Sequence, residues 1–538
     1  MKERKVTGMK QNLIRPMTDE YTEYLRDESR TVGKAETISF PASEEEIVNI
    51  VKQMEEHKTP ITLQGARTGL AAGAVPFQGH VMNMSRMDKI NGIRKDEAGN
   101  FYIKLQPGVI LSQLRKKIEL KSFDYQNWRE EDQKAYADFC DAPEHFFSPD
   151  PTEASATLGG MVACNASGAR SYRYGSIRPY VTALRIVLAS GETLEIRRGE
   201  IIAKGREIQL LTEQGRKLKI KLPSYKMPDT KNASGYYVDD NMDAIDLFIG
   251  SDGTLGIISE IEVGLLKMPP VVWGVTCFFQ QETFVLDYIK EIRNEIEEIA
   301  SMEYFDGDAL EILRQQKKKG QAFAQLPDIH PEMKAAAYLE LHTGTEKNAL
   351  LLLEKIEAIM ETAGGNPLHT WVARVDVDRD RLLFFRHAIP ESVNMLIDER
   401  KKTAPNITKL GTDMAVPDEH LHRVVTIYRK TLKEKGIQSA VWGHIGDNHL
   451  HVNLLPKSDE EYETGKKIYA EWAREITGLG GAVSAEHGVG KLKSQFLQVM
   501  FGEEAVNQMR ELKRTFDPYG MLGRDNLFTY ETEGGKTS

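Results

Sequence analysis

No part of this sequence restricts its folding options as strongly as residues 149–175, where small side chains are unusually dense. Glycine, alanine, serine and threonine make up most of residues 156–171. A tight packed turn explains two or three of these glycines, but it does not explain small residues along the whole stretch. Because such a surface lets the backbone approach a large flat ligand, the segment is predicted to form one wall of a ligand-binding site.

Two further loops have the same character, one at residues 64–73 and one at residues 250–258. The first has glycines four residues apart, unlike the G-x-G-x-x-G turn of Rossmann folds, and the chain has no G-x-x-x-x-G-K-[ST] phosphate loop. Small residues in this loop allow backbone N–H groups to surround an anion such as a pyrophosphate, and an ordinary tight turn is the alternative.

Two consecutive prolines, Pro269 and Pro270, mark the expected boundary between two domains, because proline interrupts both helices and strand ladders. A chain of 538 residues is also too long for one ordinary core. Ser43 is expected to cap an amphipathic helix, and residues 120–147 are expected to be a surface excursion. Strands are expected at residues 61–63, 183–189, 201–212, 257–266, 337–341 and 440–455, and further helices at residues 284–299 and 349–362. This mixture predicts an α+β fold.

Charge and cysteine content exclude several classes of function. The net charge is −10 and the basic residues are dispersed, which argues against a nucleic-acid-binding surface. The three cysteines form no C-x-x-C pair, which disfavours disulfides, thiolate zinc sites and iron–sulfur clusters and favours a reducing, cytoplasmic environment. The residues after positions 1–5 do not resemble a secretory signal, and no membrane span is expected.

Three histidines lie within eight residues in the second half of the chain, at His444, His449 and His451. If Asp447 and Asn448 form a two-residue hairpin turn, His444 lies directly opposite His451, and His449 shares a face with His451. Two or three imidazoles would then converge on one side of the hairpin.

Further along, Glu486 and His487 add a carboxylate and a fourth imidazole in a loop of small residues. A single histidine is more readily interpreted as a strand residue satisfied by neighbouring backbone. Four imidazoles with a carboxylate favour a site for zinc or another divalent ion, with coordination positions left open for a substrate.

The three small-residue loops, in this order and spacing, resemble the FAD-binding domain of the vanillyl-alcohol oxidase (PCMH-type) flavoprotein family. The second half resembles that family's FAD-linked oxidase cap, and the chain is most similar to the D-lactate, glycolate and D-2-hydroxyglutarate dehydrogenase branch. The resemblance implies a PCMH-type FAD-binding domain of two subdomains and a cap with an antiparallel sheet flanked by helices. The implied divisions are an N-terminal extension (1–38), the FAD-binding domain (39–270), the substrate-binding cap (271–500), and a C-terminal helix and tail (501–538) that returns to the FAD-binding domain.

The resemblance also implies noncovalent FAD. Family members with a histidine linked to the flavin carry it at the position of Arg67, where glycine is otherwise commoner. The residues implied to contact FAD are Gln64, Gly65, Ala66, Arg67, Thr68, Gly69 and Leu70 at the pyrophosphate; Pro149, Asp150, Thr152, Thr157, Gly159, Gly160, Ala163, Asn165, Gly168, Ala169 and Ser171 along the dinucleotide and flavin; and Gly253, Gly256, Ile257 and Ile258 on the adenine side.

For the cap, the resemblance implies His444, His451 and Glu486 as ligands of a divalent metal, with zinc expected and manganese or iron as alternatives. It implies His487 as the catalytic base. The family's Gly-Asp-Gly-Asn motif is replaced here by residues 446–449, Gly-Asp-Asn-His. This departure makes His449 either an extra ligand or a substitute for a group that supports the ligands.

Arg386 matches an arginine that binds the substrate carboxylate in the family, and a guanidinium suits this role because it forms two parallel hydrogen bonds with a carboxylate. Lys409 is a candidate for a second positive contact, and a solvated lysine is the alternative. Residues 376–380 resemble the start of a calcium loop but lack its glycine and glutamate, so calcium is not expected there.

The implied function is oxidation of a small 2-hydroxy acid (D-lactate-like, glycolate or D-2-hydroxyglutarate) to the 2-oxo acid, by hydride transfer to flavin N5 with metal assistance. The sequence shows no second redox centre, so an external acceptor is required: a quinone, an electron-transfer flavoprotein or a partner subunit. The sequence leaves open the identity of the acid, homodimerisation and peripheral association with a membrane.

Three alternatives stay open. An alkylglycerone-phosphate-synthase-like flavoenzyme would use the same fold without net redox chemistry. A noncatalytic flavin subunit of a glycolate-oxidase-type complex would not need an intact histidine cluster. A metallohydrolase would explain the histidines but not residues 149–175.

Overall fold

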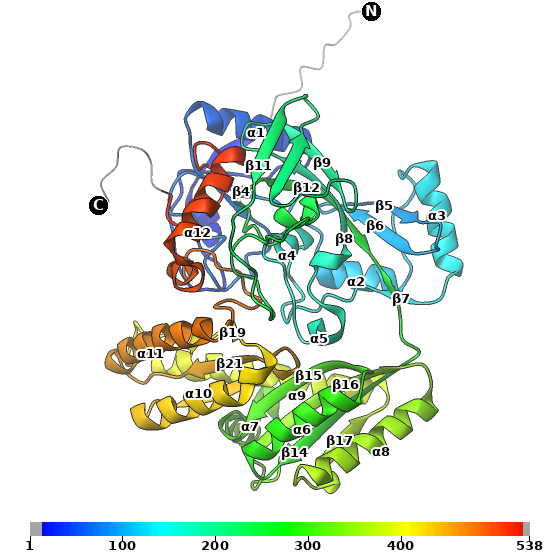
Figure 1. Cartoon of the computed structure of the whole chain (residues 1–538), viewed down its shortest axis with the longest axis vertical. Helices are drawn as coiled ribbons and strands as arrows, with labels where there is room; N and C mark the ends of the chain where they lie inside the picture. Colours follow the sequence, from blue (N-terminus) through cyan, green and yellow to red (C-terminus); the bar gives the residue numbers. More distant parts are fainter. Residues whose placement is uncertain (1–12, 531–538) are drawn as a thin grey trace, which may run out of the picture.

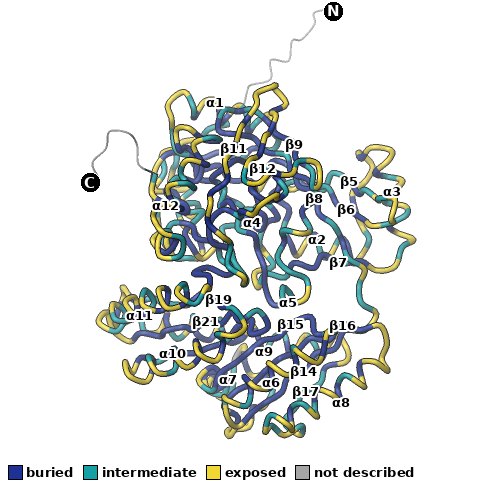
Figure 2. The backbone as a smooth tube through the Cα atoms, in the orientation of Figure 1, coloured by how far each residue is buried: buried dark blue, intermediate teal, exposed yellow. Residues whose placement is uncertain are grey.

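The computed structural model describes residues 13–530, so the expectation for residues 1–5 lies outside the described residues. Figure 1 shows two lobes, with the N-terminal half and the last helix, α12 (Ser494–Phe516), in one lobe and most of the second half in the other. Figure 2 shows buried backbone concentrated inside both lobes and exposed residues along outer helices such as α3 (Glu130–Asp141) and α11 (Asp459–Gly478). Between residues 13 and 530, no helix combines the length and the apolar character that crossing a membrane requires.

The first lobe contains a small sheet in which β2, β4 and β3 pair in parallel and β1 adds to β2 in the opposite direction. Helix α1 (Glu44–Glu56) buries its apolar side against this sheet. Ser43 Oγ accepts a hydrogen bond from the N–H of Glu46, so the expected capped helix is confirmed. The strands are β1 (Ile14–Pro16), β2 (Thr37–Ser39), β3 (Ile61–Gln64) and β4 (His80–Asn83).

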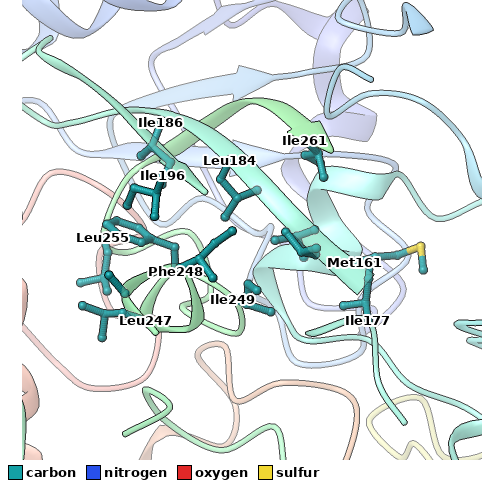
Figure 3. Packing of buried hydrophobic residues seen from close by; sticks show 14 of the residues in the cluster. Met161, Ile177, Leu184, Ile186, Ile196, Leu247, Phe248, Ile249, Leu255 and Ile261 are labelled. Atoms are coloured by element: carbon teal, nitrogen blue, oxygen red, sulfur yellow. The ribbon is translucent and has the colours of Figure 1, made fainter. Parts of the chain in front are cut away.

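A second sheet in this lobe is antiparallel and has the order β5-β6-β12-β8-β9 among the described residues. Figure 3 shows part of its core, where Leu184, Ile196 and Ile261 from three strands pack near Met161 and Phe248. Helix α4 (Leu158–Ala163), which carries Met161, is thereby fixed beneath the sheet. The strands are β5 (Ile90–Lys95), β6 (Phe101–Leu105), β8 (Val181–Val187), β9 (Thr193–Arg197) and β12 (Ile257–Gly264).

Four of the expected elements differ in the structure. The strand expected at residues 440–455 is two strands, β20 (Ser439–His444) and β21 (His449–Leu454). The strand expected at residues 201–212 is only β10 (Glu207–Leu211), paired with β11 (Lys217–Lys221), because Gly205 turns the chain at φ 58°. The surface excursion expected at residues 120–147 instead contains α3, and Trp128 and Phe139 are buried. The helix expected at residues 284–299 ends at Glu295, since Ile296 has an extended backbone and a buried strand begins at Ile299.

The second lobe is a mainly antiparallel sheet with the order β17-β14-β16-β15-β20-β21-β18 among the described residues, and β19 also pairs with β21. Side chains alternate between two cores: Ala337 and Leu339 face one core, and Tyr338 faces the other. The strands are β14 (Val271–Phe279), β15 (Ile299–Asp306), β16 (Ala335–Thr343), β17 (Thr370–Ala373), β18 (Leu410–Gly411), β19 (Met414–Ala415), β20 (Ser439–His444) and β21 (His449–Leu454).

Helices cover both faces of this sheet. One core receives α6 (Glu282–Glu295), α8 (Glu346–Thr362), α10 (Leu421–Lys435) and α11, and the other receives α7 (Gly307–Lys319) and α9 (Asp376–Arg400). The expected α+β fold, with an antiparallel cap sheet flanked by helices, is confirmed. Beyond α11 the chain returns to the first lobe through residues 479–493 and α12, which runs across the expected division at residue 500.

Candidate functional site

A cavity of about 290 Å³ is lined by residues from all three small-residue loops. Pro107 and Asn526, which the sequence did not single out, also contribute. Glu486 and His487, from the loop between α11 and α12, belong to the same lining. The predicted FAD contacts that line this cavity are Gln64, Gly65, Ala66, Arg67, Thr68, Gly69, Leu70, Thr152, Thr157, Gly159, Gly160, Ala163, Gly253, Gly256, Ile257 and Ile258.

Close packing between the walls explains two of the glycines. A Cβ on Gly65 would lie 2.1 Å from Thr157 Oγ1, and a Cβ on Gly159 would lie 2.5 Å from Pro107 Cβ. A Cβ on Gly69, in contrast, would meet no described atom within 4 Å. The first two glycines therefore hold the loops together, and Gly69 leaves open space beside the cavity.

Two buried hydroxyl groups in the cavity lining fit a polar ligand such as FAD. Thr157 Oγ1 and Ser167 Oγ have no hydrogen-bond partner among the described residues. A buried polar atom without a partner is destabilising, and a bound molecule with acceptor atoms would remove that penalty. The chemistry of the lining is therefore that of a site completed by a ligand.

Arg67 adopts a left-handed backbone conformation with φ 62°, which glycine adopts without strain. This conformation accounts for the expectation that glycine is common at this position. The guanidinium lies 4.2 Å from the centre of the Tyr24 ring and 3.5 Å from Glu23 Oε2. Arg67 thus lines the cavity, and its side chain contacts the N-terminal segment.

Six predicted FAD contacts lie outside the lining, and several connect parts of the chain instead. Ser171 Oγ donates to Asp447 Oδ2 at 2.7 Å, which joins the first lobe to the β20–β21 hairpin. Asp150 accepts a hydrogen bond from Arg115 at 2.8 Å, and a Cβ on Gly168 would lie 1.7 Å from the Asp150 carbonyl oxygen. The six residues are Pro149, Asp150, Asn165, Gly168, Ala169 and Ser171.

The two-residue turn expected between β20 and β21 is wrong. A short 3-10 helix, η7 (Ile445–Asp447), and Asn448 at φ 52° form a four-residue connection. His444 therefore pairs with His449, and His451 pairs with Trp442. The buried side chain of Ile445, which packs into the cap core, holds this longer turn. Because His449 and His451 are two residues apart on one strand, all three imidazoles still share one face.

Three of the imidazoles converge on one carboxylate oxygen, Glu486 Oε1. The Nε2 atoms of His444 and His451 each lie 3.3 Å from this oxygen, and Nε2 of His487 lies 3.6 Å from it. One donor atom from each of His444, His449, His451 and Glu486 lies within 4.8 Å of the others. Imidazole nitrogens around a carboxylate are a donor set that suits zinc or a similar divalent ion.

The opposite ring nitrogens are held by oxygen acceptors. His444 Nδ1 lies 2.6 Å from Glu303 Oε1, and His451 Nδ1 lies 3.0 Å from the carbonyl oxygen of Thr412. Such outer contacts orient a metal-binding imidazole and fix which nitrogen points inward. The residues present therefore fit a divalent metal.

Asp413 organises the loop that carries the carboxylate and the fourth imidazole. It is fully buried and accepts backbone N–H bonds from Glu486 at 3.2 Å and His487 at 3.1 Å. Its Oδ2 also lies 3.4 Å from His487 Nδ1, and Lys493 Nζ lies 2.6 Å from the same oxygen. His487 is consequently positioned with Nε2 directed toward Glu486.

Burial and charge set different protonation states within this cluster. Burial lowers the pKa of His444, but the Glu303 and Glu486 carboxylates outweigh burial and raise that pKa to about 9. Burial lowers the pKa of His487 to about 4 despite the nearby Asp413. A neutral His487 imidazole can accept a proton near pH 7.

Arg386, on α9, is buried and lies next to the cluster through Glu303, whose Oε2 is 3.1 Å from Arg386 Nε. Within residues 13–530, no hydrogen bond joins the terminal nitrogens of this guanidinium to another residue. Lys409 precedes β18, and burial lowers its pKa to about 8. No hydrogen bond or ion pair within residues 13–530 joins Lys409 to Arg386 or to the histidines.

Sequence reasoning missed Lys231, Glu303 and Asp413. Lys231 Nζ lies 3.0 Å from Glu486 Oε2, and its side chain is 8% exposed. Two of the three carry a recognisable signal: Glu303 is a charged residue flanked within its strand by apolar or small residues at 299–302 and 304–305, and Lys231 precedes a small-residue stretch, Asn232-Ala233-Ser234-Gly235. Asp413 follows Gly411-Thr412 without a distinguishing pattern.

Comparison with known proteins agrees with this architecture. A model described as a FAD binding domain matches residues 35–128 and 135–197. A model described as FAD linked oxidases, C-terminal domain, matches residues 268–527. Fold and matches together define a flavoprotein of the oxidoreductase class. The chain belongs to the PCMH-type FAD-linked oxidase family, which joins these two domains.

Curated relatives align along nearly the whole chain. A D-lactate dehydrogenase from Anaerostipes hadrus is 28% identical, over 94% of this chain and 92% of its own length. The glycolate oxidase subunit GlcD from Bacillus subtilis (strain 168) is 25% identical, over 92% of this chain and 89% of its own length. A D-2-hydroxyglutarate dehydrogenase from Stutzerimonas stutzeri (strain A1501) is 25% identical, over 91% of this chain and 90% of its own length.

Among solved structures, an alkyldihydroxyacetonephosphate synthase aligns with a TM-score of 0.61 and 15% identity. The alignment covers 96% of this chain and 82% of the other. At this identity the likeness concerns the fold.

Proposed function

We propose that the chain is a FAD-dependent dehydrogenase that oxidises a small 2-hydroxy acid to the 2-oxo acid. The observation that carries the proposal is that Glu486 and His487 line the same cavity as the three small-residue loops. The imidazole cluster thus adjoins the space suited to the cofactor. The names of the relatives, dehydrogenases of D-lactate and D-2-hydroxyglutarate and a glycolate oxidase subunit, support this class of substrate.

In this proposal the cavity-lining residues of the three loops bind FAD noncovalently, and Pro149, Asp150, Asn165, Gly168, Ala169 and Ser171 support them. Bound FAD would supply the oxidant that accepts the hydride of the substrate. His444, His451 and Glu486 would hold a divalent metal, zinc being the first candidate, which supplies Lewis-acid chemistry at the substrate hydroxyl. An external electron acceptor also belongs to the proposal, because reduced FAD must pass on its electrons before the next turnover.

The residues of the chain position and deprotonate the substrate. Arg386 binds its carboxylate, with Lys409 as a proposed second cation, and Glu303 holds both Arg386 and His444 in place. The Nδ1 atom of His487 faces Asp413, which favours a proton on Nδ1 and leaves Nε2 to accept the hydroxyl proton. A cytoplasmic location remains a prediction from the sequence.

Anaerobic mixing of the purified protein with D- and L-2-hydroxy acids tests the function. The proposal predicts a yellow protein whose flavin absorbance bleaches with one of these acids, and slower bleaching after treatment with a chelator. Absence of bleaching with every acid would favour chemistry without net redox, or a noncatalytic flavin subunit. A colourless protein that cannot be reconstituted with FAD would favour a metallohydrolase.

Substitution of Arg386 tests the orientation of the substrate. Arg386→Lys keeps a cation beside Glu303 but loses the paired hydrogen bonds, so we expect KM to rise about 10- to 100-fold. The matched control is Arg381→Lys, on the same helix, because the Arg381 side chain is 70% exposed. An unchanged KM in Arg386→Lys would remove Arg386 from substrate binding.

A further inference from the structure

His449 has no role in the function proposed above, yet it lies inside the imidazole cluster. Its side chain is fully buried, with 0% exposure. Its ring centre is 4.4 Å from that of His451 and 5.5 Å from that of His444. An imidazole so close to two others requires a physical explanation, since three buried rings in contact must each find a hydrogen-bond partner or a metal ion for their nitrogens.

The two nitrogens of His449 are arranged like those of the two proposed ligands. One nitrogen, Nε2, lies 3.0 Å from Asp413 Oδ1, an oxygen acceptor outside the cluster. The other, Nδ1, faces inward and lies 3.9 Å from Glu486 Oε2. His444 has the same pattern with its nitrogens exchanged, because Glu303 holds its Nδ1 and its Nε2 faces Glu486.

The inward nitrogen of His449 lacks a protein partner. Both ring nitrogens are buried and have no hydrogen-bond partner among the described residues, although Nε2 lies 3.0 Å from Asp413 Oδ1. Glu486 Oε2 does not supply one, because it lies 3.9 Å from Nδ1, beyond hydrogen-bond distance, and it accepts a hydrogen bond from Lys231 Nζ at 3.0 Å. A ring nitrogen that is buried, unpartnered and directed at two imidazoles and a carboxylate is a nitrogen placed for coordination.

We infer that His449 Nδ1 is a third imidazole ligand, so that this chain holds its divalent metal with His444, His449, His451 and Glu486. The inference rests on the metal of the proposed function and extends it. The four donor atoms lie within 4.8 Å of one another, so small side-chain shifts would bring each of them to about 2 Å from a bound ion.

A third imidazole changes which ion the site selects. Imidazole suits zinc, copper, nickel and iron, whereas carboxylate and carbonyl oxygens suit magnesium, calcium and manganese. With three nitrogens and one carboxylate, the site should take zinc in preference to manganese. A four-ligand set that expands to five or six positions still leaves room for the substrate hydroxyl.

Electron paramagnetic resonance of bound Cu²⁺ tests the assignment, because imidazole nitrogens split the copper signal according to their number. The full-length flavin-containing protein is stripped with a chelator and loaded with one equivalent of Cu²⁺. We expect three coordinating nitrogens in the wild type and two each in His449→Asn and His444→Asn. The matched control is His80→Asn, a buried histidine of β4 that hydrogen-bonds Thr37 and Ser39, which should retain three.

Zn²⁺ affinity, measured by competition with a chromophoric chelator, is the second readout. His449→Asn should weaken Zn²⁺ binding at least about 10-fold relative to the wild type and His80→Asn. Thermal melting and retained flavin absorbance check folding, and His449→Gln replaces the asparagine variant if that variant fails to fold.

Equal nitrogen counts in the wild type and His449→Asn would overturn the inference, even if affinity fell, because His449 would then act only by positioning Asp413. That result leaves the proposed function intact. A wild type that binds neither Cu²⁺ nor Zn²⁺ would overturn both the inference and metal assistance in the proposed function.

Discussion

Lys231 and Glu486 form a buried ion pair, with 3.0 Å between Lys231 Nζ and Glu486 Oε2. Lys231 belongs to the first lobe, and Glu486 lies in the loop that returns from the second. Burial raises the pKa of the Glu486 carboxyl, but Lys231 and the histidines outweigh burial and hold that pKa well below its usual range. The ammonium therefore keeps an anion at the centre of the imidazole cluster.

Lys231→Met should lower the free energy of unfolding of the metal-free protein by about 3–5 kcal/mol, because it leaves the buried carboxylate without its cation. Urea denaturation measures this change. Added Zn²⁺ should restore part of the loss, since the ion gives Glu486 a new positive partner. The control is Lys226→Met, which replaces an exposed lysine in the same segment; equal losses in the two variants would contradict the prediction.

Thr157→Val should weaken FAD binding up to about 10-fold, because the isosteric change removes one buried hydroxyl from the cavity lining. Stability of the flavin-free protein should stay the same or rise, because the hydroxyl has no partner among the described residues. Flavin titration of apoprotein and thermal melting measure the two effects. Unchanged FAD affinity would separate Thr157 from the cofactor.

Gly65→Ala should lower the stability of the flavin-free protein, whereas Gly69→Ala should weaken FAD binding. The Cβ at position 65 meets Thr157 at 2.1 Å, so the flavin-free protein should lose about 1–3 kcal/mol of stability. The Cβ at position 69 meets no described atom within 4 Å, so Gly69→Ala should leave that stability unchanged and weaken FAD binding. Gly344→Ala, also without a neighbour within 4 Å, is the control for both measurements.

His487→Asn should leave FAD bound but slow flavin reduction by substrate about 10²–10⁴-fold, the usual contribution of a general base. Anaerobic stopped-flow absorbance provides the rate. Because the His422 side chain is 51% exposed, His422→Asn serves as the control. Reduction at the wild-type rate in His487→Asn would assign the proton transfer to another group.

Lys409 should make stability depend on alkaline pH. Burial lowers its folded pKa to about 8, below the ordinary lysine value of 10.5, so the unfolded chain binds more protons between these two pH values. The free energy of unfolding should therefore rise with pH from about 8 to 10.5 through this group. Lys409→Met removes this contribution. Urea denaturation at several pH values should therefore show that the free energy of unfolding of the wild type rises relative to that of the variant between about pH 8 and 10.5. Below about pH 8 the difference between the two proteins should stay constant.

Features that depend on neighbouring residues could be predicted from the sequence, whereas contacts between residues far apart in the chain could not. Small residues in loops such as 64–70 can be recognised in the chain itself, and these residues line the cavity. Residues 168–171 have the same composition, but Ser171 contacts Asp447 instead. Composition cannot distinguish a wall of a cavity from a close contact between lobes, because both require small side chains.

The histidine hairpin shows the same limit. A two-residue and a four-residue turn preserve the same alternation of faces, so the imidazoles were expected to converge even though the register was wrong. Lys231 and Glu303 were missed because their partners, Glu486 and His444, lie far away in the chain. Such pairs are created by folding, so the local signals at Lys231 and Glu303 do not identify their partners.

The four-residue connection at positions 445–448 also limits which insertions and deletions the protein can accept during evolution. Since neighbouring positions on a strand point to opposite sides, gaining or losing a single codon here would direct His444 away from His449 and His451. Substitution of residues in this turn is therefore tolerated more readily than a change in its length by one residue. Among descendants of this sequence, insertions and deletions at the turn should be rarer than replacements.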